Sequence, residues 1–259
     1  PVFWMASEDH DFEEIASFRI GEYQFTWKKP GAKGPVGYLP TQDLAEQLSS
    51  WLEQVPLNDA QKKLVQSRLK AYREQKNLAE ATRQWVREWA EGLGLLVLDG
   101  QDTALKGQAA PLWTAEMDGQ YSKLIQAQTD ALVSKGYKAQ VFPREINLFD
   151  LRDGDRQRFE HSDRDCPYFY VSPNALMRPL YQEWLLPNLA YVGGGGELAY
   201  WLQLGSAFEK AGRPMTLLYL RNSLLIQDHV LSKDLQKLGL SIADLLSING
   251  EEIKRQFLG

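Results

Sequence analysis

The chain has 259 residues, and its 34 acidic and 29 basic side chains give a formal net charge of −5 at pH 7. Its residues are 44% hydrophobic and 11% aromatic, enough apolar material for one or two cores, which excludes intrinsic disorder. The acidic balance argues against nucleic acid as a partner. Cys166 is the single cysteine, which excludes an internal disulfide framework and a cysteine-rich zinc site.

Hydropathy predicts no membrane span. No window reaches the roughly 18 to 20 consecutive apolar residues that a bilayer requires, and the first residues lack the order of a secretory signal. We therefore expect a cytoplasmic protein that does not associate with membranes and whose partners are small molecules or proteins. The chain starts with Pro1 and ends on the helix-like residues 251–258, so we expect it to be a piece of a longer protein.

Strand-like sequence opens the chain. Residues 2–6 are fully apolar, which is typical of a strand buried on both faces, as in a parallel sheet, and polar residues follow at once. Alternating apolar residues at 17–27 predict a β-hairpin. The Pro/Gly-rich residues 30–40 predict a loop or linker.

From residue 41 to residue 93 the apolar period changes to about 3.6, which predicts three amphipathic helices. Thr41 is placed to cap the first helix. We expect Trp85 and Trp89 to pack in a helical core or interface, as residues of an apolar stripe usually do. The three stripes consist of Leu44, Leu48, Trp51, Leu52 and Val55; of Leu64, Val65, Leu69 and Tyr72; and of Leu78, Thr82, Trp85, Trp89 and Leu93.

Short strands alternate with helices through the rest of the chain. The expected strands are residues 95–99, 140–149, 156–159, 168–171, 189–192 and 215–219, and the expected helices are residues 117–135, a helix that starts at Pro173, and residues 197–211. This alternation predicts an α/β fold with a mainly parallel sheet and helices on both faces, into which the helical block is inserted.

Four regions follow from these patterns. Residues 1–40 form the start of the core with a hairpin and linker, 41–94 the inserted block, 95–230 the main core, and 231–259 C-terminal helices.

The densest cluster of titratable residues is Glu8-Asp9-His10-Asp11, directly after the first predicted strand, where open α/β sheets bind ligands. A histidine between carboxylates can hold a proton near neutral pH, or bind a metal while a carboxylate fixes its tautomer. The alternative is that Asp9 or Asp11 caps the next helix and His10 is solvated. As a metal site the signal is weak, because only carboxylates could complete the coordination sphere.

Gly193-Gly194-Gly195-Gly196 lies between a predicted strand and a predicted helix. Glycines there allow the backbone to approach an anionic ligand closely, and Glu197 and Tyr200 could extend a pocket. The dinucleotide fingerprint fails, however, because Leu198 replaces its third glycine. A tight crossover without a ligand is the alternative.

Two further clusters could bind a substrate. Ser172, Asn174 and Arg178 would present a hydroxyl, an amide and a guanidinium at a strand end, a set suited to a polyhydroxylated anion, although capping and a surface arginine explain them equally well. Arg144 and Glu145 lie inside a predicted apolar strand, where they must pair with each other or face a cavity.

Four blocks of the sequence, in this order, resemble the bacillithiol biosynthesis cysteine-adding enzyme family. The blocks are residues 2–12, which contain Glu8-Asp9-His10-Asp11; residues 143–149; residues 172–179; and residues 189–201, which contain the four glycines. The resemblance covers essentially the whole chain, and members of that family are much longer.

The resemblance implies a Rossmann-like core with a connecting-peptide-like insertion, and a coiled coil outside this chain that forms a homodimer. It also implies a ligase that joins the carboxylate of cysteine to the amine of glucosaminyl malate. Because an amine attacks a bare carboxylate very slowly, the resemblance implies ATP as the cofactor, with Mg²⁺ as a further candidate. Activation through an acyl phosphate and through an acyl adenylate both stay open.

The same resemblance implies roles for the candidate residues. Gly193–Gly196 and Glu197 would hold the nucleotide, Arg178 would pair with malate or phosphate, and His10 with Asp9 would orient or deprotonate the amine. These roles require the segment near residue 10 and the glycines to converge on one cleft. The remaining residues expected to bind the substrate are Glu8, Asp11, Arg144, Ser172, Asn174 and Tyr200.

The sequence departs from the family in one respect. Family members carry a Gly-Gln-Gln segment before the acidic block, which does not occur between Pro1 and Gly259, so we expect this chain alone to lack full turnover. Two alternatives stay open: a metal-dependent hydrolase centred on Glu8-Asp9-His10-Asp11, and a non-catalytic folding or dimerisation module.

Overall fold

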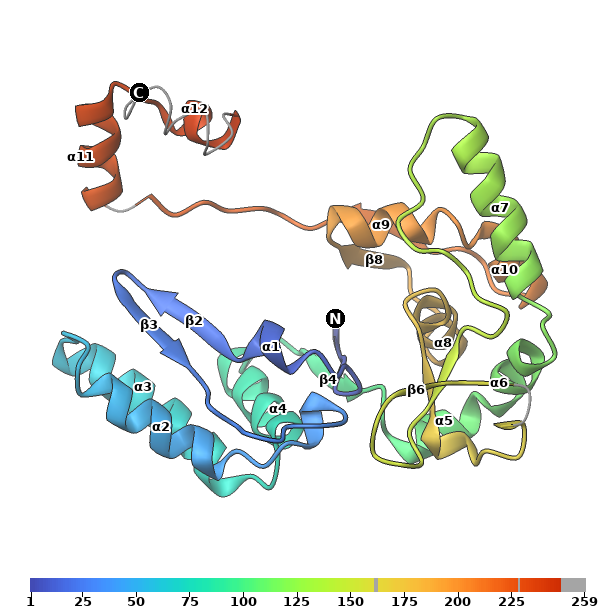
Figure 1. The fold of residues 1–259 in the computed structure, drawn as a ribbon, viewed down its shortest axis with the longest axis horizontal. Coiled ribbons are helices and arrows are strands. Elements are labelled where there is room, and N and C mark those ends of the chain that lie inside the picture. Colours follow the sequence, from blue (N-terminus) through green and yellow to red (C-terminus); the bar gives the residue numbers. More distant parts are fainter. Residues whose placement is uncertain (161–162, 228, 248–259) are drawn as a thin grey trace. The chain divides into compact units, whose positions relative to one another are not determined.

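A computed structural model describes residues 1–160, 163–227 and 229–247, and the chain divides into two compact units, Pro1–Tyr219 and Leu220–Gly259 (Figure 1). Every residue predicted for the candidate site belongs to the first unit. The second contains the helices α11 (His229–Leu238) and α12 (Ile242–Ser247). The helix predicted at 251–258 lies outside the described residues. None of the described helices is long and apolar enough to cross a membrane.

The strands predicted at residues 2–6 and 95–99 are both present. Strand β1 (Val2–Met5) pairs in parallel with β4 (Leu96–Asp99), with Val2 opposite Leu96. The prediction that β1 is buried on both faces is wrong, because Met5 alone is buried and Phe3 is 40% exposed. Among the described strands β1 has β4 as its one partner, so it is an edge strand, with fewer neighbours than a strand inside a sheet.

The other described strands form three further small sheets rather than one continuous sheet. A hairpin is confirmed at residues 17–26, where Gly21 turns the chain at a φ of 57°. The sheets are β2 (Ser17–Ile20) with β3 (Tyr23–Thr26); β5 (Leu148–Asp150) between β6 (Gln157–Arg158) and β7 (Val171–Pro173); and β8 (Ala190–Gly193) with β9 (Leu217–Leu220). The pairs β2–β3, β5–β6 and β5–β7 are antiparallel, whereas β1 and β4 pair in parallel.

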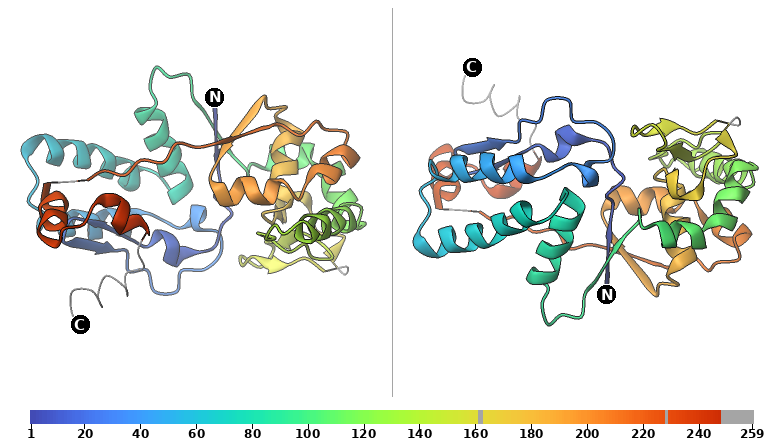
Figure 2. Two further views of the ribbon diagram at one scale, coloured as in Figure 1. Left: turned by 90° about the horizontal axis from the view of Figure 1, so that it is seen from above. Right: turned by 90° about the horizontal axis from the view of Figure 1, so that it is seen from below.

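The three predicted helices of the inserted block are confirmed as α2 (Gln42–Leu52), α3 (Asp59–Glu74) and α4 (Leu78–Trp89). Figure 2 shows α2 and α3 side by side, and α4 packs against α3. Their inner faces form a core of their own with the hairpin and the loop that follows it. The buried members of this core are Phe25, Trp27, Val36, Leu39, Leu44, Leu48 and Leu69.

Two details of this block differ from the prediction. Thr41 precedes α2, but its hydroxyl donates to the carbonyl of Tyr72 on α3 at 2.8 Å and does not cap the helix. Trp85 is half-exposed and Trp89 is 70% exposed, so neither packs in a core within the described chain, and their place in an interface stays a prediction. The buried side chains of α4 are instead those of Ala79, Ala81 and Val86.

A second core fills the rest of the first unit. Its centre is Trp113, Tyr181 and Trp201, which are completely buried. The helix predicted at 117–135 begins at Ser122, and the two helices before it were not predicted. The helices around this core are α5 (Thr103–Gln108), α6 (Ala110–Met117), α7 (Ser122–Ser134), α8 (Met177–Leu185), α9 (Gly195–Trp201) and α10 (Gly205–Lys210).

The segment from 140 to 173 contains further corrections. The strand predicted from residue 140 begins only at Leu148, because the amide N–H of Arg144 donates to Asn147 Oδ1 at 3.0 Å and closes a turn. The strand predicted at 168–171 is a 3₁₀ turn, Tyr168–Tyr170, followed by β7. Ser172 and Pro173 therefore lie in a strand, and α8 begins four residues later than predicted, at Met177.

Candidate functional site

A pocket of about 370 Å³ in the first unit brings together residues that are far apart in the sequence. Asp9 comes from the loop after β1, Asn174 from the loop after β7, and Arg178 from α8. Glu197 and Tyr200 come from α9, directly after the glycines, so the acidic segment and the glycine-led helix converge as the sequence reading required. The other lining residues are Val141, Phe142, Arg144, Phe149, Arg156, Pro173 and Ala175.

Arg178 is held by α9. Its Nη2 lies 3.2 Å from Glu197 Oε1 and donates to the Tyr200 hydroxyl at 2.6 Å. Burial lowers the pKa of this guanidinium, but Tyr200, Tyr191 and Glu197 raise it more, so Arg178 stays charged. The Nε of Arg178 is buried without a partner among the described residues.

A second arginine of the pocket, Arg156, holds Asp9. Its Nη1 lies 3.2 Å from Asp9 Oδ1, and its Nη2 donates to the carbonyl of Pro173 at 2.7 Å. The Arg156 guanidinium also lies 4.3 Å from the centre of the Phe149 ring, and the Arg144 guanidinium lies 5.3 Å from it. Two cations therefore share one aromatic ring at this wall.

Arg144 is the pocket cation best placed to meet an anion. No carboxylate of the described residues lies within 4.0 Å of its guanidinium, which stacks on Phe149 instead. Burial, Arg158 and Arg156 together lower its pKa, which reflects the positive potential at this wall. A bound carboxylate or phosphate would relieve that repulsion.

A buried ion pair lies beneath the pocket. Glu8 and Lys106 face each other at 3.4 Å, and Lys106 also donates to the carbonyl of Val171. Burial raises the pKa of Glu8, and Lys106 lowers it by less, while burial also lowers the pKa of Lys106. Ser172 is buried near Glu8 and also lowers the pKa of Glu8. The geometry between the Ser172 hydroxyl and its neighbours in the described chain falls outside that of a hydrogen bond.

Glu8 connects this layer to the pocket. It lines a small cavity of about 30 Å³ that shares Asp9, Arg156 and Arg178 with the pocket above. Glu8 and Ser172 do not line the larger pocket, and their predicted contact with the substrate stays a prediction.

His10 and Asp11 do not line the pocket. Both are exposed, and Asp11 stands at the start of α1 (Phe12–Ile15) without a side-chain hydrogen bond to it. The described residues contain no group of three or more His, Cys, Asp or Glu side chains that could hold a metal ion. Glu8 faces Lys106 and Asp9 faces Arg156, so this acidic segment offers the hydrolase alternative no support.

The glycines lie beside the pocket without lining it. The N–H of Gly194, the residue before α9, donates to Glu197 Oε2 at 2.9 Å. This N–H is therefore already hydrogen-bonded to a side chain of the protein. A side chain at Gly193 would come within 2.6 Å of the Tyr191 ring, which explains that glycine by packing. Gly195 and Gly196 face open space, where an added Cβ would meet no atom within 4 Å.

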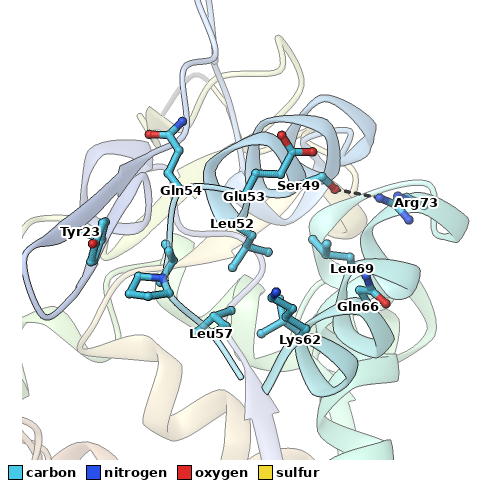
Figure 3. Close-up of a pocket in the computed structure, with 13 residues that line it drawn as sticks. Tyr23, Ser49, Leu52, Glu53, Gln54, Leu57, Lys62, Gln66, Leu69 and Arg73 are labelled. Carbon is cyan, nitrogen blue, oxygen red and sulfur yellow. Dashed lines mark hydrogen bonds between the residues drawn. The ribbon is translucent and has the colours of Figure 1, made fainter. Parts of the chain in front are cut away.

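A larger pocket, of about 930 Å³, lies in the helical block between the end of α2, the loop after it and α3 (Figure 3). Its walls include Leu52, Leu57 and Leu69, and Arg73 donates to Ser49 at 2.8 Å at its rim. None of the predicted site residues lines it. We place the candidate site in the smaller pocket because acidic and basic side chains converge there.

Comparison with known proteins decides the family. The family model described as "Bacillithiol biosynthesis BshC, N-terminal Rossmann-like domain" matches residues 1–171 and 169–222. The chain belongs to the BshC family. This confirms both the resemblance and the predicted Rossmann-like α/β fold class.

Three relatives are similar over nearly all of this chain, and each is named "Putative cysteine ligase BshC". The relative from Flavobacterium johnsoniae is 40% identical over 95% of this chain and 50% of its own length. Those from Christiangramia forsetii and Flavobacterium psychrophilum are 36% and 35% identical, over 99% and 95% of this chain and 52% and 50% of their own lengths. The chain thus spans about half the length of the curated relatives it matches.

Sequence reading of this BshC-family chain missed half of the twelve pocket-lining residues, Arg156 among them, and two buried charged residues, Lys106 and Glu116. Lys106 lies in α5, a helix that was not predicted, and Glu116 lies in the last turn of α6, also unpredicted. Arg156 was read only as strand sequence. One local signal could have indicated Arg156. In a strand after the turn at Gly154, Arg156 and Arg158 lie on the same face, which would predict a basic surface there.

Proposed function

We propose that the pocket binds glucosaminyl malate and that this chain is part of a ligase that adds L-cysteine to its amine, forming an amide in bacillithiol biosynthesis. The observation that carries the proposal is the two-signed lining of the 370 Å³ pocket, with Arg144, Arg156 and Arg178 facing Asp9 and Glu197. The substrate has the same division of charge, since malate is a dicarboxylate and the amino sugar is a cation until it loses a proton.

Each wall has a role in this proposal. Arg144, with no carboxylate partner of its own in the described chain, pairs with a malate carboxylate, and Arg178 offers a second guanidinium. Asp9, whose side chain is more than half exposed, accepts a hydrogen bond from the amine and orients it for attack. His10, which the sequence predicts to orient or deprotonate the amine together with Asp9, does not line the pocket, so no role is assigned to it here.

We further propose ATP as the co-substrate that activates the cysteine carboxylate, because a free carboxylate is a poor acceptor for an amine. The residues fit a nucleotide in part. Gly195 and Gly196 leave open space at the backbone, but Glu197 already takes the N–H of Gly194, and the described residues hold no carboxylate cluster for Mg²⁺. The residue roles proposed here therefore concern only the 370 Å³ pocket proposed to bind glucosaminyl malate, the acceptor pocket. Homodimer formation through a coiled coil stays a prediction.

The test measures cysteine ligation in the complete protein, with ATP, cysteine and glucosaminyl malate as substrates and mass spectrometry of the amide as the readout. Arg144→Ala should raise the KM for glucosaminyl malate at least about tenfold, as the loss of a charge-assisted pair implies. Asp9→Asn should lower kcat by about tenfold or more. Arg68→Ala, which removes an arginine of the helical block outside the pocket, is the matched control.

Three results would contradict the proposal: no amide from the wild-type protein, equal kinetics in Arg144→Ala and Arg68→Ala, or full activity in Asp9→Asn. His10→Ala decides whether Asp9 or His10 acts on the amine. A loss of kcat in His10→Ala, with Asp9→Asn unaffected, would assign that role to His10. Calorimetric titration with glucosaminyl malate tests the alternative of a non-catalytic module, which should bind none.

A further inference from the structure

A buried polar network lies directly behind the pocket. Glu116, at the end of α6, is completely buried, and its Oε1 accepts three hydrogen bonds. Asn147 donates two of them, from its backbone N–H at 2.6 Å and from its side-chain Nδ2 at 2.9 Å. The third comes from the Ser122 hydroxyl at 3.1 Å, which shares its single hydrogen with the carbonyl of Glu145 at 2.6 Å. When it is ionised, the Glu116 carboxylate can only accept, so it turns the amide NH₂ of Asn147 toward itself.

The other end of the Asn147 amide faces the pocket residues. Its Oδ1 accepts the backbone N–H of Arg144 at 3.0 Å and the side-chain Nδ2 of Asn174 at 2.9 Å. Asn174 in turn accepts the N–H groups of Leu176 and Met177, at 2.9 and 3.1 Å, where α8 begins. Both Arg144 and Asn174 line the pocket, so the direction of one buried amide sets the position of two pocket residues.

A carboxylate in this place is costly. Burial raises the pKa of Glu116 from 4.5 to about 7, against the hydrogen bonds from Asn147 and Ser122, which lower it. Its second oxygen, Oε2, is buried without a partner among the described residues. A neutral amide could accept the same bonds but could also turn its donor toward Asn147, so what the acid adds is a fixed direction.

We propose that Glu116 is a positioning residue of the acceptor pocket, which acts through Asn147 to hold Arg144 and Asn174 where a substrate anion meets them. This inference rests on the proposed function for the identity of the anion. The network itself is independent of the reaction, and its effect on the turn at 144–147 can be measured without turnover.

The experiment compares Glu116→Gln with Glu183→Gln in the complete protein. Glu183 is a matched control, since it too is buried and accepts from the N–H and the side-chain NH₂ of one asparagine, Asn188, at 3.0 and 2.7 Å. It does not line the pocket. Ser122→Ala, which removes one donor to Glu116, is a second variant in case Glu116→Gln does not fold.

Two readouts separate the possible failures. Glu116→Gln should raise the KM for glucosaminyl malate about three- to tenfold with kcat within twofold, and Glu183→Gln should change neither. Hydrogen exchange of the peptide that contains Arg144 should become at least about tenfold faster in Glu116→Gln but not in Glu183→Gln, since the N–H of Arg144 is held by Asn147. Ser122→Ala should show the same changes at smaller size.

Unchanged exchange and unchanged KM in Glu116→Gln would overturn the positioning role. Equal changes in Glu183→Gln would also overturn it, because they would show a general effect of losing a buried carboxylate. Faster exchange in Glu116→Gln, in a protein whose wild type ligates nothing, would support the positioning role while refuting the proposed function.

Discussion

Replacing Lys106 by Met tests the buried ion pair beneath the pocket. Lys106 is 0% exposed, lies 3.4 Å from Glu8 and donates to the carbonyl of Val171. Methionine has a similar length, so the change removes the charge and the donor with little change in volume. The variant therefore leaves the Glu8 carboxylate buried without its counter-charge.

The expected cost is large. Breaking a buried pair by removing one partner destabilises a protein by about 3 to 5 kcal/mol, because the remaining charge is uncompensated. With a urea m-value of about 3 kcal/mol/M, this corresponds to a fall of about 1 to 2 M in the unfolding midpoint, followed by tryptophan fluorescence. Lys70→Met, at an exposed i,i+4 pair with Glu74, is the control and should cost less than about 1 kcal/mol.

The dependence on pH gives the sign of the effect. Burial raises the pKa of Glu8 and Lys106 holds it down, so Lys106→Met raises that pKa further. The penalty should be largest at alkaline pH, where Glu8 must be ionised, and should shrink as acid protonates it. Adding Glu8→Gln to Lys106→Met should recover most of the lost stability.

The reasoning would be refuted if Lys106→Met stayed within about 1 kcal/mol of the wild type at pH 8, below the range for breaking a buried pair. It would equally be refuted if the double variant were no more stable than the single one. Either result would show that the interior around Glu8 is well solvated and that the pair contributes little to stability.

Three other predictions concern single sites. Because the pKa of Glu116 is raised from 4.5 to about 7, its contribution to stability is present at acid pH and is lost as the pH rises through that window. In urea titrations, the stability of Glu116→Gln relative to the wild type should therefore increase by about 3 kcal/mol between pH 4.5 and 8. A difference that does not change with pH would contradict the burial of Glu116. Gly37→Ala should destabilise the chain by about 1 to 3 kcal/mol, because its Cβ would lie 2.5 Å from the Cβ of Ser7, whereas Gly195→Ala should be neutral in the same thermal melts; equal melting temperatures would refute the close contact. Burial and a neighbouring carboxylate raise the pKa of Cys166 to about 12, so iodoacetamide at pH 8 should modify it at least about a hundredfold more slowly than a free thiol, and rapid labelling of folded protein would show the thiol to be exposed.

Much of the element order could be predicted from local pattern. The hairpin at 17–26 follows from alternation around a glycine, and α2 to α4 follow from apolar stripes. The prediction failed where a side chain redirected the backbone. Asn147 closes the turn that delays β5, and no periodicity reveals such a bond in advance.

The exposure of β1 and of Trp89 shows another limit of sequence patterns. An apolar run predicts that a segment can be buried, but burial needs a partner on each face. In the described chain β1 pairs with β4 alone, and the outer face of α4 is uncovered. Pattern alone therefore overestimated how much of these two elements is inside.

For the site, the sequence by itself determined the family, the α/β class and half of the pocket residues, including Asp9, Asn174, Arg178 and Glu197. These residues lie directly after a strand or in the first turn of a helix, and such local positions can be predicted from the sequence. The tertiary structure alone decided which charges meet. Lys106 faces Glu8, and Arg156 faces Asp9, although about 100 and 147 residues separate the partners in the sequence. Electrostatic attraction and burial depend on distance in space, so the partners of a charge appear only once the chain has folded.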